Sequence, residues 1–173
     1  MIGEELTLEE LPYSAPELAM AMSNVLAGRR VYITGWGKTA LLRALATSLY
    51  KAGLNPLYVK LEWIKYNWGV KEYIEHYYDK HYKITGYPAP REFDVSLIDD
   101  AELAAQYPNA YAKILVELKD KAKAIATRDE AYYYLEQIFG DGIHIRLEGT
   151  KNARIKLPLG LASIGRMVEI EII

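Results

Sequence analysis

The stretch VYITGWGKTALLRAL, residues 31–45, constrains the fold more than any other part of the chain. It joins a β-branched and aromatic run to a glycine turn, and leucines and alanines at helical spacing follow at once. After Gly53 and a turn at Asn55 and Pro56, the run LYVKL at 57–61 reads as a short buried strand. Strand, helix and strand in this order form a βαβ unit, in which the two strands lie parallel.

The rest of the chain predicts one α/β domain around a mainly parallel central sheet. Its strands at 30–34, 57–61 and 94–98 should be parallel neighbours, because each is apolar and helical patterns connect them. The domain spans 1–173, with a helical lead-in at 1–29, an α/β core at 30–140 and C-terminal strands at 141–173. The helical patterns cover about 15–27, 38–52, 70–82, 108–127 and 128–139.

The C-terminal part has a different texture. The runs GIHIRLEG, ARIKLPLG and RMVEIEII alternate apolar and charged residues and are separated by turn residues. This alternation is typical of a β-meander or hairpin with one solvated face. It therefore predicts an antiparallel C-terminal β extension on the parallel core.

Composition excludes several classes of site. The chain has 173 residues, a net charge of -2 and no cysteine, so disulfides and thiolate metal sites are absent and no strong field attracts nucleic acid. The histidines at 76, 81 and 144 lack the usual zinc spacing. No apolar run is long enough for a membrane span and no signal peptide is evident, which predicts a cytoplasmic protein. Many Glu, Lys and Tyr residues without cysteine suggest a thermophilic source.

The glycine turn resembles a phosphate-binding loop. Such a loop reads G-x-x-x-x-G-K-[ST] between a strand and a helix, so that its amides, lysine and hydroxyl hold phosphates and magnesium. Gly37, Lys38 and Thr39 match its end, but Gly35 lies only two residues before Gly37, which leaves the loop three residues short. The alternative is a tight glycine turn with a surface lysine.

Two acidic positions add to this pattern. Asp99 and Asp100 follow the run VSLI, and an acid at the tip of a buried strand beside a phosphate loop can orient magnesium. Glu62 follows PLYVKL, and a carboxylate there could activate a water molecule for attack on a phosphate. The alternatives are an aspartate pair that starts a helix and a solvated glutamate at a strand end.

In this order the motifs resemble the RecA/RadA/KaiC class of P-loop ATPases, and the C-terminal runs resemble the hairpin strands of archaeal RadA paralogs. The resemblance implies a RecA-like three-layer fold, ATP and Mg²⁺ as ligands, and Glu62 as the catalytic carboxylate. It implies Thr39 and Asp99, or Asp100 in the other register, at the magnesium ion. The nucleotide-binding residues that it implies are Gly35, Gly37, Lys38, Thr39 and Ala40.

The shortened loop favours a degenerate recombination or repair paralog that acts by binding a protein partner, a second copy of itself or DNA. One alternative is an active small ATPase that completes its site in an oligomer, and another is an interaction module without a ligand. For DNA, aromatic residues at 66–82 interleaved with lysines could form a single-strand platform. We expect instead that at least two rings of Tyr73, Tyr77 and Tyr78 pack into the core.

Overall fold

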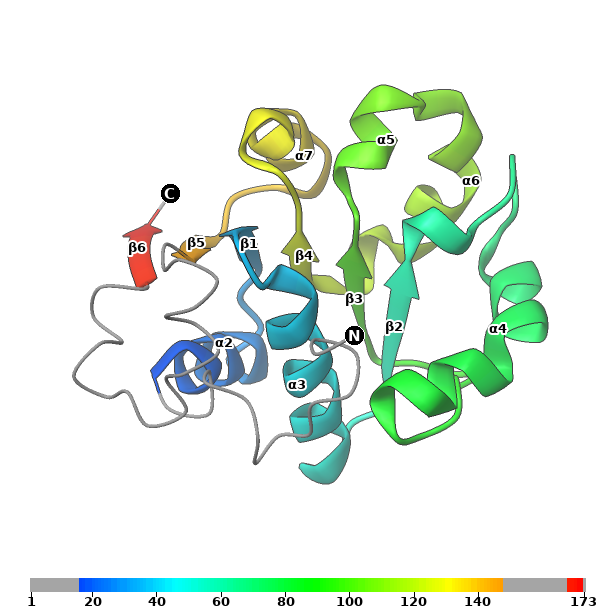
Figure 1. Cartoon of the computed structure of the whole chain (residues 1–173), viewed down its shortest axis with the longest axis horizontal. Helices are drawn as coiled ribbons and strands as arrows, with labels where there is room; N and C mark the ends of the chain where they lie inside the picture. Colours follow the sequence, from blue (N-terminus) through cyan, green and yellow to red (C-terminus); the bar gives the residue numbers. More distant parts are fainter. Residues whose placement is uncertain (1–15, 148–167, 173) are drawn as a thin grey trace.

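The computed structural model describes residues 16–147 and 168–172 and shows an α/β protein with one central sheet (Figure 1). The strands are β1 (Val31–Gly35), β2 (Pro56–Lys60), β3 (Val95–Asp99), β4 (Ala122–Ala126), β5 (Ile143–Leu147) and β6 (Val168–Ile172). The α-helices are α2 (Pro16–Leu26), α3 (Lys38–Lys51), α4 (Val70–Thr85), α5 (Glu102–Gln106), α6 (Pro108–Leu118) and α7 (Tyr132–Phe139). Short 3₁₀ turns are η2 (Leu61–Trp63), η3 (Lys119–Lys121) and η4 (Asp129–Ala131).

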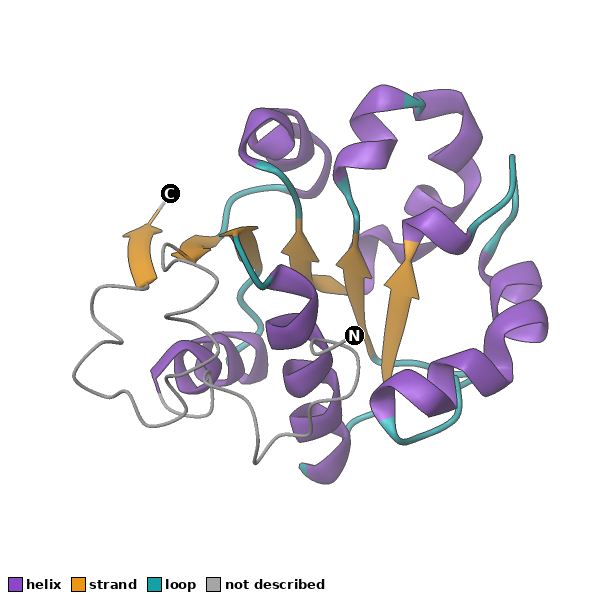
Figure 2. Ribbon diagram, viewed as in Figure 1, coloured by secondary structure: helices purple, strands orange, loops and turns teal. Residues whose placement is uncertain are grey.

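The strand order in the sheet is β2-β3-β4-β1-β5-β6. The first five strands in this order are parallel, so their carboxyl ends meet at one edge of the sheet (Figure 2). β6 pairs antiparallel with β5. α3 connects β1 to β2, and these two strands are separated in the sheet by β4 and β3. The connection through α3 is therefore a crossover along one face of the sheet.

Helices cover both faces of the sheet, as the three-layer arrangement in Figure 1 shows. On one face α2 and α3 pack on Val31, Ile33 and Leu97, while α5, α6 and α7 pack on Tyr32 and Ile98 on the other. This division follows from the alternation of side chains along each buried strand. α4 lies beside β2, the strand at one end of the sheet.

The predicted βαβ unit is confirmed, and so is the α/β class with parallel strands close to the expected positions. One expectation is wrong. The segment predicted as helix over 108–127 ends as β4, which lies between β3 and β1, so β1 is a direct neighbour of neither β2 nor β3. Within the run GIHIRLEG, Ile143–Leu147 form β5, which lies parallel to β1 and belongs to the main sheet, and β6 in the run RMVEIEII pairs antiparallel with β5. The run ARIKLPLG lies outside the described residues.

Side chains complete the free edge of β2. The Tyr87 hydroxyl donates to the carbonyl of Pro56 at 2.7 Å, and the Tyr73 hydroxyl donates to the carbonyl of Tyr58 at 2.8 Å. The Tyr73 hydroxyl also accepts the backbone N–H of Lys60, at 3.1 Å. α4 and the loop after it therefore supply hydrogen bonds that another strand would otherwise make.

Among residues 16–147 and 168–172, none of the helices combines the length and the apolar character that a bilayer span requires.

Candidate functional site at the carboxyl edge of the sheet

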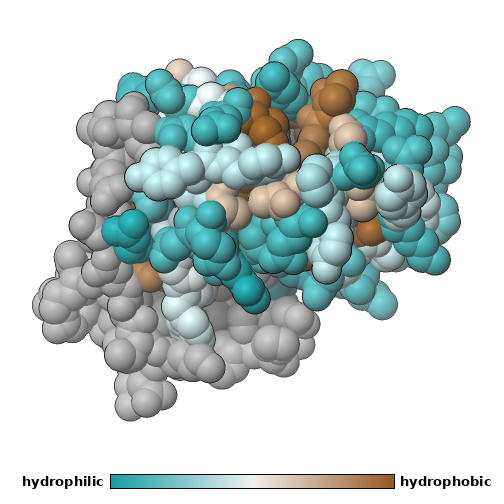
Figure 3. Space-filling model, turned by 90° about the horizontal axis from the view of Figure 1, so that it is seen from above, coloured by the Kyte–Doolittle hydropathy of each residue, from teal (hydrophilic) through white to brown (hydrophobic). Residues whose placement is uncertain are grey.

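The predicted site residues gather where the parallel strands end. Figure 3 views the molecule from above relative to Figure 1, toward the end to which β2, β3 and β4 point. Hydrophilic residues cover most of the described surface in this view, with small hydrophobic areas between them. In α/β proteins with parallel sheets, this edge is the usual place for a ligand.

The turn after β1 is held by β5. Gly35 pairs with Leu147 in the β1–β5 register, and the N–H of Trp36 donates to the Leu147 carbonyl oxygen at 3.2 Å. Gly35 has a φ of +98°, and a Cβ atom at this position would lie 2.0 Å from that oxygen. The close approach of β5 therefore explains this glycine without a phosphate group.

The first turn of α3 carries the rest of the predicted nucleotide-binding set. Gly37, with a φ of 94°, is the N-cap of α3, and no side chain caps the helix there. The Lys38 ammonium donates to the carbonyl oxygen of Gly35 at 2.7 Å, so it folds back over the turn. Ala40 is buried in the core under α3. The amides of this first turn have no partners within the helix, as in any α-helix.

Thr39 and Asp99 are in direct contact. The Thr39 hydroxyl donates to Oδ2 of Asp99 at 2.8 Å, and the Tyr58 hydroxyl donates to the same oxygen at 2.6 Å. Oδ1 of Asp99 accepts the backbone N–H of Asp100 at 2.9 Å. The Asp99 side chain is only 1% exposed. Burial, with Asp99 beside it, raises the pKa of the Tyr58 hydroxyl well above its usual value.

Lys60 brings a positive charge to these acids. It pairs with Asp99 in the β2–β3 register, and its Nζ lies 2.9 Å from Asp100 and 3.7 Å from Asp99. Burial alone would lower the pKa of Lys60, but the two carboxylates outweigh it and raise the pKa. The pKa of Asp100 rises to about 6, because burial and the neighbouring Asp99 outweigh the attraction of Lys60.

A cavity of about 290 Å³ lies beside this cluster. Glu62, exposed at the start of the β2–α4 connection, lines it together with Thr39, so the structure brings these two predicted residues together. Lys38, Asp99 and Asp100 lie at the same edge of the sheet but are not among the lining residues. The full lining is Thr39, Arg43, Tyr58, Lys60, Glu62, Trp63, Lys80 and Ile84.

Protein groups already engage both acids at the predicted magnesium site. Both oxygens of Asp99 accept hydrogen bonds, and Asp100 forms an ion pair with Lys60 through Oδ2. Magnesium needs oxygen ligands in near-octahedral geometry and usually takes one or two carboxylates. Within the part of the chain that the structure describes, no group of three or more His, Cys, Asp or Glu residues could hold a metal ion. Thr39, Asp99 and Asp100 therefore do not fit magnesium as they stand.

Sequence reasoning missed four residues at this site: Tyr58, Lys60, Arg43 and Lys80. Tyr58 and Lys60 alternate along β2 and so share the face that carries α3, a signal that was available in the run PLYVK. Arg43 stands one turn after Thr39 in α3 and is 5% exposed. Its guanidinium donates to the carbonyl oxygen of Ile84, at 3.2 Å from Nη2.

The aromatic residues of α4 do not form an exposed row. Tyr73 is fully buried, Tyr77 is half-buried against Trp63, and Tyr78 is 43% exposed. The expectation that two of the three rings are mostly buried is met by Tyr73 and only in part by Tyr77. Because Tyr73 is buried and its hydroxyl is hydrogen-bonded to β2, its ring cannot stack on a base. Tyr73 therefore cannot be part of a single-strand platform.

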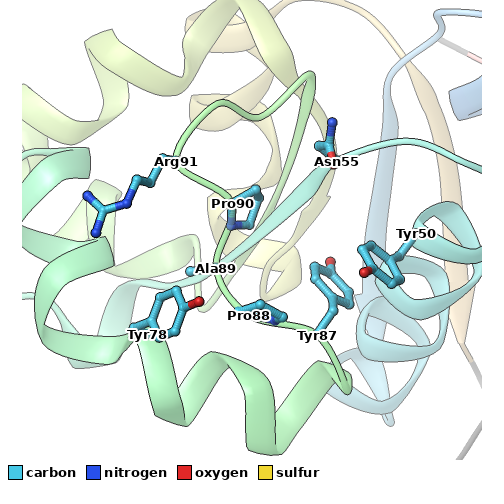
Figure 4. Close-up of a pocket in the computed structure, with 8 residues that line it drawn as sticks. All are labelled: Tyr50, Asn55, Tyr78, Tyr87, Pro88, Ala89, Pro90 and Arg91. Atoms are coloured by element: carbon cyan, nitrogen blue, oxygen red, sulfur yellow. The ribbon is translucent and has the colours of Figure 1, made fainter.

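A second cavity, of about 390 Å³, lies beyond the opposite end of β2 (Figure 4). The rings of Tyr50 and Tyr87 stack along it with centroids 4.3 Å apart, and Pro88 and Pro90 continue the wall. None of the predicted site residues lines this cavity. It is therefore separate from the cluster around Asp99.

No protein-family model, curated protein or solved structure matches the chain.

Proposed function

We propose that the chain is a RecA-like ATPase-fold protein, a degenerate recombination or repair paralog that binds nucleotide weakly and hydrolyses little or none of it. The observation that carries the proposal is the 2.8 Å hydrogen bond from the Thr39 hydroxyl to Asp99. It joins the end of the GKT turn to the acid that ends β3, the two motifs on which the resemblance depends. An uncapped helix N-terminus at the same edge favours an anion such as phosphate.

Three features support weak binding and little turnover. The turn is short and is held by β5 through Gly35 and Trp36, so few amides converge on one phosphate. The Lys38 ammonium is engaged by the Gly35 carbonyl. Glu62, the proposed water-activating carboxylate, lines the cavity but sits on a 3₁₀ turn rather than on the strand itself.

In this proposal the protein acts through a partner: another protein, a second copy of the chain or, with less support, DNA. Large side chains that are exposed on α4, α6 and α7 or their flanking loops would suit a protein surface, since tyrosine is enriched at interfaces. Tyr66, Val116 and Tyr133 are each more than 70% exposed. A cytoplasmic location and an antiparallel C-terminal β extension are part of the same proposal.

The test is a calorimetric titration of the full chain with ATP, together with an assay of released phosphate. We expect weak binding and phosphate release at background. Lys38→Ala should weaken ATP binding by about three- to tenfold, because it removes one partly exposed charge. Lys65→Ala is the matched control, because Lys65 is exposed on the β2–α4 connection and does not line the cavity.

Two outcomes would replace this proposal. Robust phosphate release that Lys38→Ala abolishes would show that the short loop works and would establish the small-ATPase alternative. No binding of ATP to the wild-type chain would leave the interaction module without a ligand as the better description.

A further inference from the structure

The ion pair between Lys60 and the acids at the tip of β3 is fixed by the sheet itself. Lys60 and Asp99 stand opposite each other in the β2–β3 register, and both side chains lie on the face that carries α3. Lys60 is 18% exposed and Asp99 only 1%. An ion pair with so little solvent around it is screened less than a surface pair.

The hydrogen bonds of Asp99 leave little room for a second cation. Oδ2 accepts the hydroxyls of Thr39 and Tyr58, and Oδ1 accepts the N–H of Asp100. A divalent ion bound to Oδ2 of Asp99 would have to displace one of the two hydroxyls that donate to this oxygen, and it would compete with Lys60 for both acids. Removing a partner from a buried charge costs more than the new contact returns unless the replacement is as well coordinated.

The cavity next to this cluster is lined by more bases than acids. Arg43, Lys60 and Lys80 line the cavity together with one acid, Glu62, and since Lys60 is paired with Asp99 and Asp100, the positive charge of the wall comes mainly from Arg43 and Lys80. The Lys80 ammonium lies 4.4 Å from the centroid of the Trp63 ring, which holds it at the cavity wall. A phosphate group is attracted to such a wall without a metal ion between them.

We propose that Lys60 takes the place of the divalent cation, so that this cavity binds phosphate-bearing ligands without magnesium. The part that concerns ligands rests on the proposed function, whereas the part that concerns Lys60 and the acids does not. Lys60 is thus a positioning residue that holds Asp99 and Asp100 beside one positive charge, while Thr39 and Tyr58 donate to Asp99.

The first experiment needs only the wild-type chain. ATP is titrated in buffer with EDTA and in buffer with excess Mg²⁺, and the chain alone is titrated into Mn²⁺ while the free ion is followed by electron paramagnetic resonance. We expect Mg²⁺ to tighten ATP binding by less than about threefold. We also expect the free Mn²⁺ signal to stay unchanged, since the Lys60 ammonium already lies between the two acids.

The second experiment removes the charge of Lys60 but keeps most of its length. Lys60→Met should take up Mn²⁺ at one site, because Asp99 and Asp100 then lack a counter-charge. Lys65→Met, the matched control, should behave as the wild type does.

The outcomes separate the two proposals. If the wild-type chain binds no ATP in either buffer, the proposed function is refuted. The comparison of Mn²⁺ uptake by the wild type and by Lys60→Met would still decide the role of Lys60. Uptake of Mn²⁺ by the wild-type chain, abolished by Asp100→Asn, would overturn the inference, and so would ATP binding that requires Mg²⁺. If Lys60→Met does not fold, the two wild-type titrations still either support the inference or overturn it.

Discussion

Nε2 of His81 accepts a hydrogen bond from the backbone N–H of Tyr58, with 3.1 Å between the two nitrogens. Nδ1 of the same ring lies 3.0 Å from the carbonyl oxygen of Tyr87, so the neutral tautomer with the proton on Nδ1 satisfies both partners. His81 is fully buried in α4, beside the edge strand β2. A helix side chain thus pairs a backbone group that an edge strand would otherwise expose.

This hydrogen bond predicts a pH-dependent stability. Burial lowers the pKa of His81 from 6.5 to about 4. The hydrogen bond to the Tyr87 carbonyl alone would raise this pKa, but the effect of burial is larger. Because the pKa is lowered in the folded state, the unfolded chain binds a proton at His81 first as the pH falls. The unfolding free energy that neutral His81 contributes is therefore fully present above pH 6.5 and is lost as the pH falls toward 4. The shift corresponds to about 3 kcal/mol of unfolding free energy, to be measured by urea unfolding at several pH values.

The comparison must be made with His81→Gln, because other groups titrate over the same range. Burial raises the pKa of Glu17 to about 7 and that of Asp100 to about 6, and these groups act in the opposite direction. The free energy difference between the wild type and His81→Gln should therefore shrink as the pH falls from 6.5 to 4. A difference that stays constant would show that His81 does not titrate in this way.

Tyr73→Phe should destabilise the same edge. The change removes the hydroxyl that bonds to the carbonyl of Tyr58 and to the N–H of Lys60, and it leaves two backbone groups without these partners. We expect a loss of about 2–4 kcal/mol in unfolding free energy. Tyr82→Phe, on the same helix at 56% exposure, should change it by less than about 0.5 kcal/mol. Equal effects of the two changes would contradict the role of Tyr73.

These contacts show which parts of the fold were open to prediction. Local patterns predict the βαβ unit: a β-branched run, a glycine turn and leucines at helical spacing. β4 is not, because its sequence AKAIA consists mainly of residues that favour helices, and only its position between β3 and β1 makes it a strand. Local pattern therefore predicts a helix that continues through this strand.

The candidate site divides in the same way. Thr39 and Asp99 stand out because each follows a recognisable element, and the parallel sheet places both at one edge. Lys60 does not stand out in the sequence, because its role depends on the register of β2 against β3, and no local pattern specifies that register. The motif alone predicts a phosphate-binding role for Gly35, and the approach of Leu147 from β5 is a separate reason for a glycine there, which no local pattern reveals.

Gly35→Ala tests that explanation. The new Cβ would overlap the Leu147 carbonyl oxygen at 2.0 Å, in addition to the strain of a φ of +98°. We expect a loss of at least roughly 3 kcal/mol in unfolding free energy. Gly28→Ala is the matched control, since Gly28 has a φ of +82° but nothing within 4 Å of its added Cβ. It should cost about 1–2 kcal/mol; equal losses would mean that β5 does not constrain the turn.

The contact between Thr39 and Asp99 can be measured by a double-mutant cycle. Thr39→Val and Asp99→Asn are combined, and unfolding free energies give the coupling between the two side chains. A hydrogen bond to a buried carboxylate should couple them by about 1.5–3 kcal/mol. The control cycle pairs Asp99→Asn with Thr47→Val, because Thr47 lies on the same helix but bonds to the carbonyls of Arg43 and Thr85. Its coupling should stay below about 0.5 kcal/mol.

The size of this coupling bears on the site whether or not a nucleotide binds. Strong coupling at Thr39 alone would mean that the GKT turn and the tip of β3 act as one unit in solution, which any ligand at this edge must contact or displace. Equal, small couplings in both cycles would mean that Asp99 is held mainly by Tyr58 and Lys60. In that case the hydrogen bond that carries the proposed function would contribute nothing, and the motif would be a glycine turn beside an unrelated ion pair.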